Sequence, residues 1–180
     1  MRKIVLTFGL IAGGILSAMM AIAFAFHDQI GFDKGYIVGY TSMVLAFLMV
    51  FFGVRSYRDN VAGGSVTFGR AFMVGLMITA IASVCYVATW ELIYHEFAPD
   101  FMDKYAAYEV EKAKASGATD AQVAAQVQKM AAFKQMYQNP LANIALTLLE
   151  PLPVGLVFTV LAAGVLSRKK RAEGASVAQA

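Results

Sequence analysis

The chain has 180 residues, of which 59% are hydrophobic and 15% are charged. This balance excludes an ordinary soluble globular domain and predicts an integral membrane protein. The net charge of +3 does not indicate nucleic-acid binding, because the basic residues form short clusters beside apolar runs, as topology determinants do. The single cysteine, Cys85, lies in an apolar run and can form neither an internal disulfide nor a cysteine metal site.

Four apolar stretches are long enough to cross a bilayer, which takes about 20 residues at a rise of about 1.5 Å each. Arg2 and Lys3 precede the first stretch as they would precede a cleavable signal, but its apolar run is longer than a signal core of about 7 to 15 residues. We therefore expect a retained first helix and an all-α fold, a four-helix transmembrane bundle. The predicted spans are residues 4–26, 36–54, 71–94 and 141–166.

Basic residues gather before the first span, between the second and third, and after the fourth. With four spans, all three clusters fall on one side of the membrane, and the positive-inside rule makes that side the cytoplasm. Both termini are then cytoplasmic. We expect the later clusters to contact anionic lipid headgroups, with Asp59 paired to one of the arginines. The basic residues of these two later clusters are Arg55, Arg58, Arg70, Arg168, Lys169, Lys170 and Arg171.

The polar connection between the third and fourth spans, residues 96–139, has two helical patterns. Phe101, Tyr105 and Tyr108 recur at helical spacing, and Gly117 supplies a stop. Thr119 begins a capping-box pattern that opens a second helix. We expect an extracytoplasmic amphipathic αα-hairpin. The short connection around residues 27–33 also faces outward, and residues 172–180 are expected to form a disordered cytoplasmic tail.

Small residues recur every four positions along the first span and form a ridge that permits close backbone approach. The ridge either mediates dimerisation or contacts another span internally, and we favour the internal contact. A small or polar stripe in the third span is the candidate partner. The ridge consists of Gly9, Gly13, Ser17, Ala21 and Ala25, and the stripe of Gly75, Thr79, Ala82, Ser83 and Tyr86.

A carboxylate and two prolines, Glu150, Pro151 and Pro153, interrupt the fourth span. At helical rise, Glu150 lies about 13 Å along this span, in the outer half or middle of a hydrocarbon layer of about 30 Å. The prolines lack a backbone N–H and should open the helix, which frees the carbonyls of Thr147 and Leu149. A charge at this depth costs about 2.5 to 3.5 kcal/mol, so Glu150 needs a donor or stays protonated. The candidate donors are Ser42, Tyr86, Trp90 and Asn143.

Glu150 has three interpretations: a protonated structural group, part of a proton or cation pathway, or a site for a polar ligand or partner. A weaker candidate lies at the outer end of the third span, where Glu91 and His95 are four residues apart. With His27 they could form a metal site, since carboxylate and imidazole suit zinc. We favour interfacial anchoring for these three residues, and we expect neither a metal nor a cofactor.

Several sequence motifs in this order resemble an uncharacterised bacterial family, the domain-of-unknown-function family four-one-nine-nine, and the resemblance covers nearly the whole chain. It implies a bacterial inner-membrane protein of four spans, with no activity, cofactor or catalytic residue to carry over. The motifs are "SYRDN" at 56–60, "GGSVTFGRAF" at 63–72, "TWE" at 89–91, "PDFMDKYAAY" at 99–108, "YQNPLANIALT" at 137–147 and "LEPLPVGL" at 149–156.

Two classes of function follow from these features. The first is a structural or accessory subunit that docks a membrane or periplasmic partner, or a second copy, through the hairpin or the ridge. The alternative is a small proton- or cation-coupled transporter or channel component that uses Glu150. An enzyme ranks third, because no serine, cysteine or carboxylate pair has a recognisable base beside it.

Overall fold

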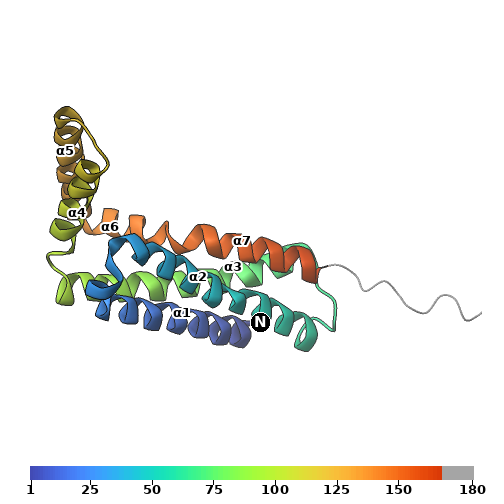
Figure 1. Cartoon of the computed structure of the whole chain (residues 1–180). Helices are drawn as coiled ribbons and strands as arrows, with labels where there is room; N and C mark the ends of the chain where they lie inside the picture. The colour runs from blue at the N-terminus through green and yellow to red at the C-terminus, as the bar shows by residue number, and fades with distance from the viewer. Residues whose placement is uncertain (168–180) are drawn as a thin grey trace, which may run out of the picture.

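The computed structural model describes residues 1–167, and every regular element in that range is a helix. Four segments are long and apolar enough to cross a membrane, namely Arg2–Ala25, Gln29–Asn60, Phe68–Phe97 and Pro140–Leu166. The predicted all-α fold with four such spans is confirmed. The elements in Figure 1 are α1 (Arg2–Ala25), α2 (His27–Asn60), α3 (Phe68–Leu92), the π-helix η1 (Ile93–Phe97), α4 (Phe101–Ala115), α5 (Asp120–Tyr137), α6 (Pro140–Leu148) and α7 (Pro151–Leu166).

The long segments run side by side as a bundle (Figure 1), in which α1 and α7 each pack against both α2 and α3. The core between them contains Leu16 of α1, Phe47 of α2 and Ile78 of α3, all fully buried. Because lipid tails are as apolar as these side chains, close packing rather than escape from water holds helices together in a bilayer.

Two glycines of α1 let it approach α3 closely. A Cβ added at Gly9 would lie 2.9 Å from the Ile81 side chain, and one added at Gly13 would lie 2.7 Å from the Cys85 side chain. Only glycine leaves room for these neighbours. The internal contact favoured for the small-residue ridge is confirmed at both positions, and it sets the register of α1 on α3.

The rest of the ridge is less enclosed. The hydroxyls of Ser17 and Thr89 are hydrogen-bonded across the α1–α3 contact at 2.7 Å. Beyond this pair, the ridge leaves the helix contact, and its last two members are exposed, Ala21 and Ala25.

The predicted partner stripe on α3 is wrong at Gly75 and Thr79. Gly75 and Thr79 contact α7 instead of α1: a Cβ at Gly75 would lie 3.0 Å from Thr159, and the hydroxyls of Thr79 and Thr159 are 3.1 Å apart. Ala82 meets the ridge as expected, with its Cα 3.5 Å from a Cβ placed on Gly13. A helix packed between two neighbours carries small residues on two faces, and a stripe read along the sequence does not say which neighbour each face meets.

The second span begins earlier than predicted. Residues 27–35, expected to form an outward connection, are helical, and Phe26 alone separates α1 from α2. The helix is interrupted at Gly31, whose φ of 68° and ψ of 167° are accessible mainly to glycine. Polar residues lower the hydropathy of this segment without preventing a helix, so the end of the apolar run did not mark the start of α2.

α4 and α5 pack against each other and project from one end of the bundle (Figure 1). Gly117, with a φ of 82°, lies in the turn between them. The predicted capping box is confirmed: the Thr119 N–H donates to Gln122 Oε1 at 2.8 Å, and the Gln122 N–H donates to the Thr119 hydroxyl at 3.4 Å. An ion pair between Asp103 and Lys134 joins the two helices. We call α4 and α5 the hairpin.

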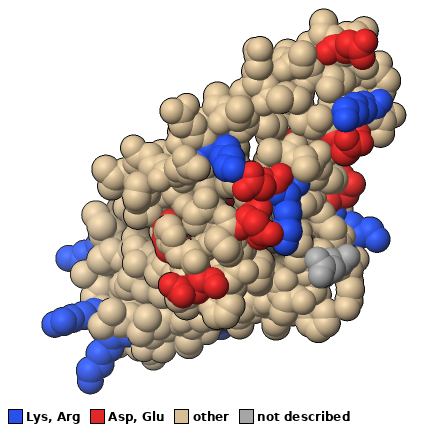
Figure 2. Space-filling model, turned by 90° about the vertical axis from the view of Figure 1, so that its left-hand side faces the viewer, with Lys and Arg blue, Asp and Glu red and all other residues tan. Residues whose placement is uncertain are grey.

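Charged side chains differ between the two ends of the molecule. At the hairpin end, acidic and basic groups are interspersed, as Figure 2 shows. The end of α2 lies at the opposite end of the molecule, near the N-terminus (Figure 1). There, Asp59 pairs with Arg58 at 2.7 Å and with Arg55 at 3.6 Å, as predicted. Arg70, near the start of α3, is exposed. Some residues with predicted roles lie outside the described part of the chain, namely Arg168, Lys169, Lys170, Arg171 and the tail 172–180.

Candidate functional site

A cavity of about 400 Å³ lies where the bundle meets the hairpin. Its lining comes from α1, α2, α3, α4, α5 and the end of α6, and includes Glu150. The volume falls within the range of about 300 to 1,000 Å³ that is typical of small-molecule sites. We call this space the Glu150 cavity.

Glu150 is brought to the cavity by a break in the fourth span. α6 ends at Leu148 and α7 begins at Pro151, which occupies the first position of the new helix, where a missing N–H is tolerated. The predicted opening of the helix is therefore confirmed. The expectation of a free Thr147 carbonyl is wrong, because that oxygen accepts a hydrogen bond from the Glu150 N–H at 3.3 Å.

Tyr86 of α3 is the hydroxyl donor to Glu150. Its oxygen lies 2.6 Å from Glu150 Oε2, and both residues line the cavity. Glu150 is an exposed residue and forms part of the cavity lining. Since an ionised carboxylate offers about four acceptor positions, one such bond leaves capacity for another donor.

The other three predicted donors bind elsewhere. Ser42 lines the cavity, but its hydroxyl donates to the Val38 carbonyl at 2.7 Å. Trp90 Nε1 donates to the Tyr137 hydroxyl at 2.6 Å. Asn143 accepts from Thr147 at 3.2 Å within α6 and is not part of the lining. Depth along a span predicts the height of a side chain and not the direction in which it points, so these assignments failed.

Aromatic rings from α2, α3 and α4 form much of the cavity wall. The Phe32 ring lies 5.9 Å from Phe101, 5.6 Å from Tyr105 and 4.9 Å from Tyr108, between ring centroids. Trp90 continues the wall, with its ring 4.9 Å from Phe101 at 79°. Separations and tilts in this range are favourable between aromatic side chains.

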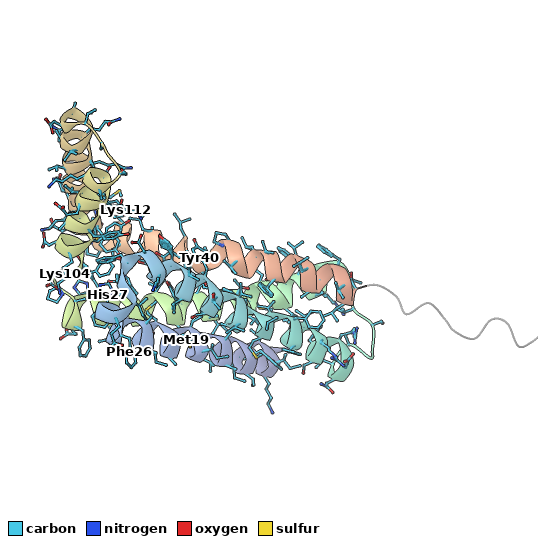
Figure 3. All side chains as sticks on the ribbon, in the orientation of Figure 1. Met19, Phe26, His27, Tyr40, Lys104 and Lys112 are labelled. Carbon is cyan, nitrogen blue, oxygen red and sulfur yellow. The ribbon has the colours of Figure 1, made fainter. Side chains whose placement is uncertain are left out.

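Asp33 joins α2 to α4 beside the cavity. Its Oδ1 accepts a hydrogen bond from Lys112 Nζ at 2.9 Å and another from the Tyr108 hydroxyl. The Lys112 nitrogen also lies 5.2 Å from the centroid of the Tyr108 ring. Hydrogen bonds to Tyr108 and Asp33 raise the pKa of Lys112 above its ordinary value. These three residues, the Asp33 clasp, hold the hairpin against the start of α2, where Figure 3 shows Lys112 at the junction.

Tyr137 connects the end of the hairpin to α3. Besides accepting from Trp90, it packs its ring 5.3 Å from Tyr94, at 76°. Burial raises the pKa of Tyr137 to about 12. The two contacts fix the ring of Trp90 in the cavity wall.

The three residues of the possible metal site do not come together. His95 and Glu91 form a pair at 3.3 Å, whereas the ring of His27 lies edge-on to Phe32 at 4.6 Å. In residues 1–167, no group of three or more His, Cys, Asp or Glu side chains is placed to hold a metal ion. Glu91 and His95 remain as a local pair at the end of α3.

Four segments that are long and apolar enough to cross a membrane, the last of them broken, are consistent with a multi-pass helical membrane protein. The chain belongs to the family described as "Protein of unknown function (DUF4199)", whose model matches residues 7–168. The resemblance expected from the sequence motifs is therefore confirmed. No curated protein and no solved structure matches the chain.

The cavity wall was not predicted as a unit. Phe101, Tyr105 and Tyr108 were recognised as the apolar face of a helix, and this spacing was the available signal. Phe32 had no such signal, because it lies in a segment that the sequence predicts to be a connection, and Tyr36 is predicted only as the first residue of the second span. Their position against α4 depends on the interruption of α2 at Gly31.

Proposed function

We propose that this protein is a membrane-embedded binding protein that holds a small molecule in the Glu150 cavity. One observation carries the proposal: an acidic residue in a broken span lines a cavity of about 400 Å³ whose wall contains many aromatic rings. A carboxyl inside a membrane span is costly and marks a functional site by default. Apolar walls with a few convergent polar groups are typical of ligand sites.

The polar chemistry available to a ligand comes from Glu150 and Tyr86. Their mutual hydrogen bond orients the carboxylate, and the aromatic wall supplies contact area to an apolar body. Binding in this arrangement requires no catalytic step. A structural role alone would not need the carboxyl to face a space large enough for a ligand.

Transport of the bound molecule is a second candidate, favoured by the break at Glu150. Discontinuous helices at mid-membrane are a recurring device of transporter sites, because unwound backbone and helix ends coordinate the cargo. The docking of a partner or of a second copy is a separate proposal for the hairpin. It draws on two large apolar side chains of α5, Val127 and Met136, which are 48% and 45% exposed.

We also propose that the protein resides in a bacterial inner membrane with both termini in the cytoplasm. Support comes from the arrangement of Arg55, Arg58 and Arg70, which lie at the end of the bundle opposite the hairpin, together with the N-terminus (Figure 1). Under the positive-inside rule, that end is cytoplasmic and the hairpin is periplasmic.

A cavity-filling variant tests the binding function. Gly39 lines the cavity, and a Cβ added there meets nothing within 4 Å, so Gly39→Phe should fill the space without a backbone clash. Gly14→Phe is the control, because Gly14 is equally unobstructed but lies outside the lining. The probe is the neutral fluorophore N-phenyl-1-naphthylamine. Its binding is measured by energy transfer from Trp90, the single tryptophan.

We expect saturable energy transfer in the wild type and in Gly14→Phe, and its loss in Gly39→Phe. Both variants insert one phenyl group into a span, so dissolution of the probe in detergent affects them equally. Equal transfer in Gly39→Phe and the wild type would remove the cavity as the binding site.

A further inference from the structure

We infer that the Glu150 cavity is selective for an organic cation, a molecule that carries one positive charge on an apolar or aromatic body. This inference rests on the proposed binding function and specifies the class of its ligand. It combines three observations about the lining: its charge, its aromatic surface and its size.

The charge of the lining is acidic. Glu109 and Glu150 both contribute to it, and none of the described lining residues is Lys or Arg. Among them, the group that can become cationic is His27, whose ring packs edge-on against Phe32. The nearby Lys112 ammonium is engaged by Asp33 and Tyr108 in the clasp. An anionic ligand would therefore meet carboxylates without a cation placed to offset them.

The aromatic surface suits a cation. Aromatic rings attract a positive charge over their faces at distances within about 6 Å of the ring centre, which is how aromatic cages hold quaternary ammonium groups. Trp90, Phe101 and Tyr105 line the cavity together with Glu150. At its edge, the Lys112 ammonium already lies over the face of Tyr108, at 5.2 Å from the centroid. A ligand cation can thus combine ring contacts with the carboxylate.

The geometry of Glu150 distinguishes a cation from a neutral ligand. Its Oε2 accepts from Tyr86, and the residue is exposed and lines the cavity. When this carboxyl is ionised, a neutral occupant displaces water from it without replacing the lost charge stabilisation, and should therefore bind more weakly than a cation of the same size. An organic cation both pairs with the carboxylate and fills the apolar space.

Size and ligand chemistry favour an organic ion over a metal ion. A cavity of about 400 Å³ accommodates a molecule of many atoms, whereas Ca²⁺ takes about 6 to 8 oxygen ligands at close range. The described residues hold no cluster of three acidic, His or Cys side chains that would supply such ligands. Most of the lining would remain unused around a bare ion.

Two probes of matched shape and opposite charge test the inference. Tetraphenylphosphonium and tetraphenylborate each carry four phenyl groups on a central atom, so their binding to the purified full-length protein compares charge at nearly constant size. Equilibrium dialysis with protein-free micelles subtracted gives both affinities. We expect saturable tetraphenylphosphonium binding that is stronger than tetraphenylborate binding by about tenfold or more.

A charge-neutralising pair of variants locates the selectivity. Glu150→Gln keeps the shape of the side chain and removes its charge, and should weaken tetraphenylphosphonium binding by about tenfold. Glu111→Gln is the matched control, because Glu111 is exposed on α4 and pairs with Lys114 at 2.7 Å, outside the lining. It should leave the affinity unchanged. The two-probe comparison in the wild type remains decisive if Glu150→Gln fails to fold.

The outcomes separate this inference from the proposed function. Equal affinity for the two probes, or equal weakening by Glu150→Gln and Glu111→Gln, overturns the cation selectivity. If N-phenyl-1-naphthylamine binds to the wild type but not to Gly39→Phe, the binding function stands without the cation selectivity. Failure of all three probes to bind removes the binding function and the cation inference together.

Discussion

The Tyr86 hydroxyl of α3 donates a 2.6 Å hydrogen bond to the Glu150 carboxylate at the break between α6 and α7. These residues are 64 positions apart in the chain. Their contact ties the interrupted span to its neighbour and orients the one carboxylate of that span toward the cavity.

The Tyr86–Glu150 bond should contribute modestly to stability. Tyr86→Phe removes the donor while keeping the ring, and should lower the free energy of unfolding by about 1 kcal/mol. Glu150→Gln retains hydrogen-bonding capacity at similar volume and should cost less than Glu150→Ala. Trp90 fluorescence during thermal unfolding in one detergent ranks the three variants. Identical stability of Glu150→Ala and the wild type would show that the bond stabilises nothing.

If the bound molecule is also transported, flux must depend on the Glu150 charge. Glu150→Gln should then abolish pH-dependent or cation-dependent flux in liposomes while the protein remains folded. Glu111→Gln, which changes an exposed charge outside the cavity, should retain that flux. Absence of any such flux for the wild type, both alone and with co-purifying proteins, would eliminate transport and leave binding.

Adjacent glycines of α1 should respond oppositely to enlargement. Gly13→Leu places a side chain where its Cβ already lies 2.7 Å from Cys85, so we expect a destabilisation of about 2 kcal/mol. Gly14→Leu points into open space and should have little effect. Reversible unfolding of both variants, in the same detergent, gives the difference. Similar losses for the two would contradict the α1–α3 register.

The Asp33 clasp should hold the hairpin through a protonated Lys112. Because its hydrogen bonds raise the folded-state pKa of Lys112 above the ordinary 10.5, the clasp contributes fully below pH 10.5 and is lost as pH rises through the folded value. Spin labels at Thr7→Cys and Ser116→Cys, in a Cys85→Ala background, report the hairpin position by pulsed electron resonance. The distance distribution should stay narrow at neutral pH and broaden only at strongly alkaline pH.

A pair of lysine variants isolates this effect. Lys112→Gln should broaden the distribution already at neutral pH. Lys114→Gln removes a lysine that pairs within α4, with Glu111 at 2.7 Å, and should not. Broadening of equal size in both variants would indicate a general loss of positive charge rather than loss of the clasp.

The proposed topology places the hairpin and the α2–α3 connection on opposite sides of the membrane. In a Cys85→Ala background, Ser116→Cys should react with a membrane-impermeant maleimide added to intact cells, whereas Ser65→Cys should react only after lysis. Both residues are exposed, so access rather than burial decides the result. Equal labelling of both in intact cells would refute the orientation.

The sequence by itself determined the class of the protein and much of its helical outline. Span length and apolar content are local properties, and so the four membrane-spanning segments were predictable without knowledge of their neighbours. The break at Glu150 was predictable for a similar reason, because a proline lacks an N–H whatever surrounds it. The Thr119 capping box likewise depends on residues three positions apart.

Only the tertiary structure decided which faces meet and what they enclose. Tyr86 and Ser42 are both predicted at depths near Glu150, but Tyr86 donates to its carboxylate, whereas Ser42 donates to a carbonyl of its own helix. Beside the cavity, α2 is interrupted at Gly31, and the next residue, Phe32, packs against rings of α4. Such contacts depend on the rotation of each helix about its axis and on the angle at which the hairpin leaves the bundle. These are set by packing between distant segments, which periodicity along a single segment does not record.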